Sequence, residues 1–193
     1  MVDEAHSLGV LGASGRGLAQ ETGVEDLIDF TTGTFSKSLA GIGGFCVSRH
    51  PELEVIRYTS RPYIFTASPS PATIATTRQA LNIISTNPQL REQLWKNANQ
   101  LYSGLAQLGY ELSPEISPVI AVNADTQENA MSMWTQLFEQ GVYVNMVLPP
   151  ATPGSRCLLR CSLSAAHNSE QIERVIQAFA NLQELPMLKQ HIA

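Results

Sequence analysis

The chain has 193 residues, of which 44% are hydrophobic, so it is long enough to bury one large or two small cores. Seventeen acidic against 12 basic side chains give a net charge of −5, which argues against nucleic acid as the main partner and offers no basic stripe for a membrane surface. No apolar run has the length of a transmembrane segment and no leader-like stretch opens the chain, so a cytoplasmic globular protein is expected.

The three cysteines form no CxxC pair, and together with the four histidines they show no spacing typical of a metal site. We therefore expect reduced, mostly buried thiols at Cys46, Cys157 and Cys161, and no bound metal.

Residues 1–70 are rich in glycine and hydroxyl side chains. Within them, the apolar runs Leu27 to Phe30 and Gly44 to Ser48 predict buried strands of an α/β sheet. Asp3 follows the apolar start of the chain, and Lys37 stands among small hydroxyl residues. Ligands in open α/β sheets bind beyond the carboxyl ends of the strands, so these two residues are candidates for a site.

The pairing of Asp3 with Lys37 favours a pyridoxal phosphate site. A lysine forms the Schiff base that carries this cofactor, and a carboxylate keeps the pyridine nitrogen protonated so that the ring accepts electrons. Thr34 and Ser36 supply hydroxyl and backbone N–H groups for the phosphate. Each residue alone has a commoner explanation, as a turn residue, a solvated charge or a loop hydroxyl. The conjunction is what favours the cofactor.

A glycine series follows the Asp3 motif, at Gly9, Gly12, Gly15 and Gly17. No GxxxxGK[ST] sequence accompanies it, so we interpret these glycines as tight backbone turns beside the cofactor and not as a nucleotide loop.

The next part, residues 71–112, is expected to be a helical segment that bridges two domains and is interrupted at Asn87-Pro88. The last part, residues 113–193, is predicted to form a small α+β domain. Its expected elements are strands Pro118 to Asn123, Val142 to Val147 and Cys157 to Leu163, a helix Thr126 to Gln140 and a helix after Asn168.

The two helices of the last part carry N-terminal signals. Asp125 with Glu128, and Asn168 with Gln171, have the spacing of a capping box. An apolar face at helical spacing is expected to belong to the core, and consists of Ile172, Val175, Ile176 and Phe179. His167 is interpreted as a structural residue near the start of the last helix.

Several motifs together resemble the α-oxoamine synthases over essentially the whole chain. They are Asp-Glu-Ala-His-Ser-x-Gly-x-x-Gly at 3–12, Gly15-Arg16-Gly17, Gly33-Thr34-Phe35-Ser36-Lys37-Ser38 with Gly43-Gly44, and Leu158-Leu159-Arg160-Cys161-Ser162. Members of this family are fold-type I pyridoxal phosphate enzymes that condense an amino acid with an acyl-CoA and release CO2. The resemblance implies an α/β fold, in which part of the large cofactor-binding domain (1–70) precedes the small C-terminal domain.

The resemblance also implies roles for single residues. Lys37 would carry the cofactor and act as the base for the α-proton, while His6 would contact the phenolic oxygen of the cofactor and position the substrate. Arg160 would bind the substrate carboxylate, although a solvated arginine that points outward is the alternative. Thr66 would reach the phosphate of the neighbouring subunit's cofactor, which implies a homodimer with a shared active site.

Two segments are more similar to bacterial members that use L-serine and a long-chain acyl-CoA, to give a 3-keto sphingoid base, than to members that use glycine. They are Arg61 to Ser68, and Tyr143 to Met146 followed by Pro149 to Pro153. One departure is Leu148, where some bacterial members have an arginine linked to the substrate carboxylate. Arg160 must therefore contribute more to binding that carboxylate. Because family members are longer, we expect this chain to correspond to the C-terminal half of an enzyme and to be inactive alone.

Three alternatives remain open. A related synthase that uses glycine or alanine would keep the same residues in the same roles. A non-catalytic remnant or regulatory subunit is disfavoured by the retention of Lys37. Asp-Glu-Ala-His is also the Mg²⁺ and ATP box of a helicase group, but the acidic balance and the Ser36-Lys37 motif argue against that function.

Overall fold

The computed structural model describes residues 1–183, and the chain forms two compact units. The first unit comprises Met1–Arg91 and the second begins at Glu92. The boundary between the units lies inside a helix, within the helical segment expected over 71–112.

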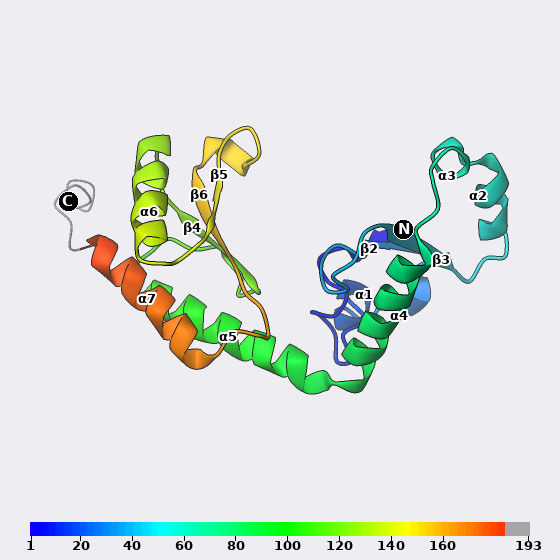
Figure 1. Cartoon of the computed structure of the whole chain (residues 1–193), viewed down its shortest axis with the longest axis horizontal. Coiled ribbons are helices and arrows are strands. Elements are labelled where there is room, and N and C mark those ends of the chain that lie inside the picture. The colour runs from blue at the N-terminus through cyan, green and yellow to red at the C-terminus, as the bar shows by residue number, and fades with distance from the viewer. Residues whose placement is uncertain (184–193) are drawn as a thin grey trace. The chain divides into compact units, whose positions relative to one another are not determined.

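The first unit is built around a three-stranded sheet of order β1-β2-β3, in which β1 runs parallel to β2 and β2 antiparallel to β3. Its elements in chain order are β1 Val2–Asp3, α1 Leu18–Glu21, a 3-10 helix Glu25–Leu27, β2 Phe30–Thr34, β3 Gly44–Ser48, α2 Leu53–Thr59, α3 Arg61–Ile64 and α4 Pro71–Thr86 (Figure 1).

The strand predicted at Gly44 to Ser48 is confirmed, whereas the strand predicted at Leu27 to Phe30 is wrong. The observed strand begins at Phe30, because the Leu27 amide instead closes a turn onto the carbonyl of Val24. The strand itself consists largely of threonines, which are β-branched and favour extended backbone. Neither strand is buried by the described residues of this unit, and Cys46 is exposed, unlike Cys157 and Cys161.

The expected interruption of the helical segment is confirmed, since α4 ends at Thr86 and α5 Pro88–Gln107 follows. The hydroxyl of Ser70 caps α4 by accepting the Thr73 amide at 3.2 Å, and Pro71 occupies the first turn, where its missing N–H costs nothing.

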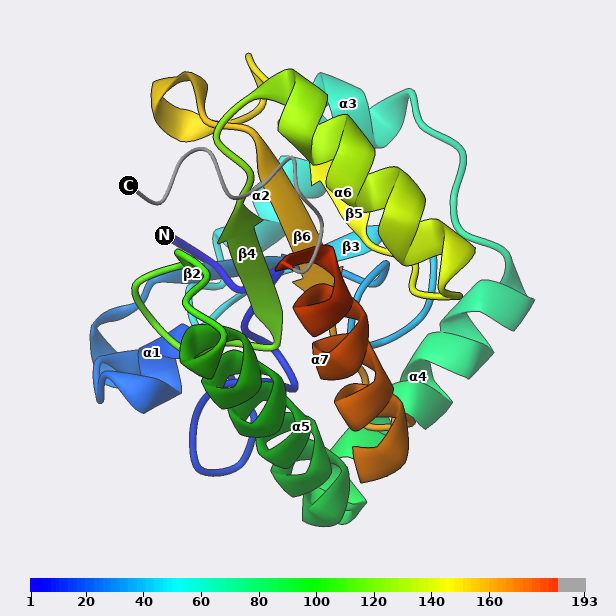
Figure 2. The ribbon, with the colours of Figure 1, turned by 90° about the vertical axis from the view of Figure 1, so that its left-hand side faces the viewer.

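The second unit is an α+β structure, as predicted, with an antiparallel sheet of order β4-β6-β5. Its elements after α5 are β4 Val119–Asn123, α6 Gln127–Glu139, β5 Asn145–Val147, a 3-10 helix Pro153–Ser155, β6 Leu158–Ser162 and α7 Ser169–Gln183. Helices α5, α6 and α7 lie against one face of the sheet (Figure 2).

The core of the second unit fills the space between these helices and that face. Fully buried side chains come from each layer and include Leu101, Ile120, Leu137, Leu159 and Phe179. The apolar face predicted for the last helix belongs to this core, which confirms that interpretation. The opposite face of the sheet carries the alternate residues of β6, Arg160 and Ser162, which are exposed.

The two predicted helix caps differ in outcome. Asn168 and Gln171 form a reciprocal capping box, with each side chain accepting the other's backbone N–H at 2.9 Å. The cap of α6 is Thr126 and not Asp125, since the Thr126 hydroxyl accepts the Asn129 amide at 3.1 Å. Asp125 instead has a φ of 56°, outside the conformation of a capping residue.

Candidate functional site

The parallel pairing of β1 with β2 brings the two key motifs to one edge of the first sheet. Asp3 lies opposite Thr32, and β2 ends two residues later at Thr34. The Glu4 amide extends the pairing by donating to the carbonyl of Thr32 at 2.8 Å. Because both strands run in the same direction, the Asp3 motif and the Lys37 turn leave the sheet at the same side.

The turn that carries Lys37 is organised by hydroxyl and backbone hydrogen bonds. Thr34 and Ser36 place their hydroxyl oxygens 2.9 Å apart, and the Ser36 amide donates to Thr34 Oγ1 at 3.2 Å. The Thr34 hydroxyl also contacts the carbonyl of Gly43 at 3.1 Å, which closes the base of the turn. Gly44 lies against the backbone there, since a Cβ would meet the Gly33 oxygen at 2.6 Å. The Lys37 side chain is exposed at the tip.

Asp3, the last residue of β1, and His6, three residues later, are both exposed. The Asp3 carboxylate accepts the Ala5 amide on Oδ1 at 2.9 Å, and this bond leaves Oδ2 available. The chain turns directly after the strand, with the amides of Ser7 and Leu8 donating to the carbonyl of Glu4. The structure therefore brings Asp3, His6 and the Lys37 turn to one region of the first unit.

Sequence reasoning missed the most buried polar group of this region, the Glu4 carboxylate, which is 1% exposed. It accepts the Leu18 amide at 2.7 Å, the Ala19 amide at 2.9 Å and the Ser7 hydroxyl. Glu4 thereby ties the Asp3 motif to the end of the glycine loop. In the sequence only the acid beside Asp3 points to this role, because the amides of Leu18 and Ala19 that it accepts lie beyond the glycine series.

The glycine series does form tight turns, as predicted. Positive φ values occur at Gly9, Gly12, Gly15 and Gly17. The closest approach is at Gly17, where an added Cβ would lie 2.2 Å from the Glu4 carboxylate.

Thr66 is exposed in the segment between α3 and α4, and its hydroxyl donates to the carbonyl of Pro62. No hydrogen bond of the described chain links Thr66 to residues 3–6 or 34–37, so the structure does not join it to the other predicted residues. Large exposed apolar side chains precede it at Tyr63, Ile64 and Phe65.

Arg160 projects from the exposed face of β6, between the buried Leu159 and Cys161. Within the second unit its charge therefore lies on the face of the sheet that the helices do not cover. Its Nη2 donates to Asn145 Oδ1 at 3.3 Å, and no ion pair involves Arg160 in the described chain. Leu148 is partly buried against the core, where an aliphatic side chain fits.

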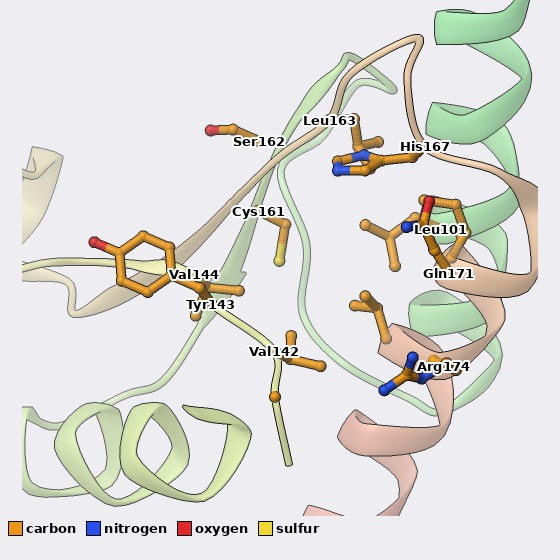
Figure 3. Close-up of a pocket in the computed structure, with 13 residues that line it drawn as sticks. Leu101, Val142, Tyr143, Val144, Cys161, Ser162, Leu163, His167, Gln171 and Arg174 are labelled. Atoms are coloured by element: carbon orange, nitrogen blue, oxygen red, sulfur yellow. The ribbon is translucent and has the colours of Figure 1, made fainter. Parts of the chain in front are cut away.

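A cavity of about 320 Å³ lies in the second unit among α5, α7 and the residues before β5 (Figure 3). None of the predicted site residues lines it. His167 does, and its Nδ1 accepts the Ser164 amide at 3.2 Å, while Asn97 donates to the carbonyls of Ser164 and His167. This structural role matches the interpretation of His167. Burial raises the pKa of the Cys161 thiol, which also lines the cavity, to about 12.

Within residues 1–183, no group of three or more His, Cys, Asp or Glu side chains is arranged to hold a metal ion. Over the same range, no helix combines the length and apolar character needed to cross a bilayer.

Comparison with protein families matches residues 1–179 to the model of aminotransferase class I and II. The serine palmitoyltransferase of Caulobacter vibrioides is 53% identical over 94% of this chain and 45% of its own length. The corresponding enzyme of Sphingomonas paucimobilis is 47% identical over 93% of the chain and 43% of its own length. The chain thus spans a little under half the length of these curated relatives.

Solved structures give the same result. A high-resolution structure of SPT with a PLP internal aldimine is 47% identical, with a TM-score of 0.90 over 93% of this chain and 46% of that chain. The Sphingomonas wittichii serine palmitoyltransferase is 46% identical with the same TM-score and coverage. With the fold, the paired strand ends and these relatives in agreement, the chain belongs to the aminotransferase class I and II family and has its fold-type I architecture.

Proposed function

We propose that this chain supplies catalytic and substrate-binding residues for a pyridoxal phosphate-dependent condensation of L-serine with a long-chain acyl-CoA. In this reaction the bond from Cα of serine to its carboxylate breaks and releases CO2. A bond from Cα to the acyl carbon forms, the thioester C–S bond breaks, and CoA leaves as the thiol. The product is a 3-keto sphingoid base.

The observation that carries the proposal is the parallel pairing of β1 with β2. It puts Asp3 at the end of β1 and the Lys37 turn after the end of β2, at the same side of the sheet. The 53% identity to the Caulobacter vibrioides serine palmitoyltransferase supports the choice of serine among amino acids.

The residues at this edge fit pyridoxal phosphate. The Lys37 amine is exposed and has no ion-pair partner in the described chain, as attachment to an aldehyde requires. The hydroxyls of Thr34 and Ser36 and the turn amides offer donors to a phosphate, and Oδ2 of Asp3 is available to a protonated ring nitrogen. When bound, the cofactor supplies an electron sink for the carbanion formed at Cα.

The side chains of the site then have distinct tasks. Lys37 would take the α-proton of the substrate on Nζ. His6, on the turn after β1, positions the substrate, and Arg160 binds its carboxylate through parallel N–H donors.

We further propose a homodimer in which Thr66 reaches the phosphate bound by the partner subunit. The exposed apolar side chains of Tyr63, Ile64 and Phe65 beside Thr66 support an interface at this segment, because such a cluster favours burial against another protein surface. The cytoplasm is the proposed location, since acyl-CoA is the co-substrate.

The test joins this chain to the N-terminal part of the Caulobacter vibrioides enzyme and assays CoA release from palmitoyl-CoA with L-serine. We expect turnover, and we expect borohydride reduction to attach the cofactor covalently to the peptide that contains Lys37, as read by mass spectrometry. Lys37→Ala should abolish both signals, whereas Lys96→Ala, at an exposed lysine of α5, should leave both intact. Attachment at another lysine, or turnover that persists in Lys37→Ala, would refute the assignment.

A second candidate function is condensation with alanine or glycine. It is favoured by the 8-amino-7-oxononanoate synthase of Alkaliphilus oremlandii, which is 33% identical over 95% of this chain and 46% of its own length. The same assay decides between the two: a higher kcat/KM for alanine or glycine than for L-serine would replace the sphingoid product with another amino ketone.

A further inference from the structure

We infer that Asn145 is a positioning residue, which orients the Arg160 guanidinium while leaving its charge free for the substrate carboxylate. This inference rests on the proposed role of Arg160, and it adds a residue that acts on the substrate only through that arginine.

The strand register places the two residues together. Asn145 on β5 is directly opposite Arg160 on β6 in the antiparallel pair. Side chains directly opposite each other in such a pair project from the same face of the sheet. Since Leu159 and Cys161 point into the core, Arg160 and Asn145 share the face that the helices of this unit do not cover.

The contact between them is specific. Nη2 of Arg160 donates to Oδ1 of Asn145 at 3.3 Å. A guanidinium has five N–H donors, so this bond holds the group from one side while a pair of parallel donors remains for a carboxylate. On the other side of β6, the residue opposite Arg160 is Ala121, whose methyl group cannot compete for these donors.

The chemical type of the partner is the informative feature. Arg91 donates to the backbone carbonyl of Ala13, and four other arginines of the described chain, Arg16, Arg49, Arg57 and Arg156, are paired with carboxylates. Arg160 is held instead by a neutral amide, which accepts a hydrogen bond without neutralising the guanidinium. An aspartate at position 145 would have nearly the same shape, but it would occupy the arginine as an ion pair.

A purely structural role for Asn145 predicts the opposite behaviour. The strands β5 and β6 are already joined by their backbone pairing, so the side chain is not needed to hold them. If Asn145 only fastened Arg160 to the sheet, an aspartate would fasten it more firmly and would be tolerated.

The experiment measures the KM for L-serine, the KM for palmitoyl-CoA and kcat in the joined enzyme described above. Asn145→Asp is expected to raise the KM for L-serine about tenfold or more, because a charge-assisted bond to the substrate is lost. Asn145→Ala, which removes only orientation, should raise it by a smaller factor of about three. The KM for palmitoyl-CoA and the unfolding midpoint should stay unchanged in both variants.

Asn99→Asp provides the matched control, because it makes the same change at an exposed position of α5, outside the strands. It should leave both KM values, kcat and the unfolding midpoint unaltered. In a double-mutant cycle, Asn145→Asp should add nothing to Arg160→Met, because it acts through that arginine. The inference is overturned if Asn145→Asp matches the wild type, or if its effect persists beside Arg160→Met. If Arg160→Met alone leaves the KM for L-serine unchanged, the proposed role of Arg160 fails as well.

Discussion

Glu4 shows how a single side chain can arrange a site that it does not itself serve. Its carboxylate is buried, and backbone amides and a hydroxyl satisfy it. A buried carboxylate is tolerated only when it is hydrogen-bonded in this way. Because Glu4 is anchored in this way, the backbone of its neighbour Asp3, the last residue of β1, is held in place as well.

This packing predicts that alanine is poorly tolerated at position 17. Gly17→Ala would bring a Cβ against the Glu4 carboxylate and would also strain a residue with a φ of 113°. Gly23→Ala is the matched control, because Gly23 has a φ of 71° but no atom within 4 Å of its Cβ position. The control should lose about 1 kcal/mol of unfolding free energy from backbone strain alone, and Gly17→Ala clearly more, by urea denaturation. Equal losses would show that the contact with Glu4 is unimportant.

The cysteines allow a prediction about chemical reactivity. Burial raises the pKa of Cys161 to about 12 from an ordinary value of 9.0, so its thiolate is scarce at neutral pH. Ellman's reagent should react rapidly with one thiol of the native chain, the exposed Cys46, and with all three after unfolding in guanidinium. Rapid loss of the Cys161 thiol in the folded state would contradict the burial.

The same shift has a direction for stability. Burial favours the neutral thiol in the folded state. Its contribution to the free energy of unfolding is therefore fully present below pH 9 and is lost as the pH rises from about 9 through about 12. Replacing Cys161 with Ala should flatten the fall in unfolding free energy over that alkaline window, relative to the wild type.

Among single elements, the ends of the helices show that a residue's capping propensity does not by itself decide which residue caps the helix. Sequence spacing selected Asp125 as the cap of α6, but Thr126 performs that role. Both residues are good caps, and the choice between them depends on which one has extended backbone angles. The cap of α7 also has a hydroxyl neighbour, Ser169, but there the earlier residue Asn168 caps the helix, and the prediction for Asn168 and Gln171 is confirmed.

This difference is testable by substitution. Thr126→Ala should lower the unfolding free energy by about 1 kcal/mol, because the Asn129 amide loses its acceptor. Asp125→Gly should be neutral or stabilising, since glycine adopts a positive φ more readily than aspartate. A larger loss for Asp125→Gly than for Thr126→Ala, measured by urea denaturation, would restore Asp125 as the cap.

At the scale of the whole chain, the two units differ in how much core they contain. Among the described residues, Ala19 and Leu39 are the buried hydrophobic residues of 1–91, and all the others belong to the second unit. The strands of the first sheet have exposed apolar side chains, for example Val47. Residues 1–91 therefore bury little apolar surface within this chain.

Hydrogen exchange should report this difference. We expect amides in β4, β6 and α7 to exchange far more slowly than those in β2 and β3, because local opening is easier where few apolar contacts are lost. Joining the chain to the N-terminal part of its Caulobacter vibrioides relative should slow exchange in β2 and β3 and change β4 and β6 much less. Equal protection of both units in the chain alone would contradict the burial pattern.

Predictions from the sequence succeeded where the interactions are local along the chain and failed where the partners are distant in sequence. The helices after Ser70 and after Pro88 were placed well, because prolines and capping side chains act within one turn. The strand after Leu27 was placed too early, because β2 has no apolar run and gains its strand character from two neighbouring strands. Glu4 was missed because its two amide partners, Leu18 and Ala19, lie fourteen and fifteen residues further along the chain.

The amino-acid sequence alone shows which chemical groups the chain contains. The residue types at Asp3, Lys37 and Arg160 and their motifs are local facts, and they were sufficient to identify the family that the comparisons support. The arrangement of those groups depends on how the strands pair. Parallel pairing of β1 with β2 brings Asp3 and the Lys37 turn to one sheet edge, and cross-strand register gives Arg160 a neutral partner in Asn145. The physical reason is that strand pairing joins residues remote along the chain, and no local pattern encodes which residue will stand opposite another.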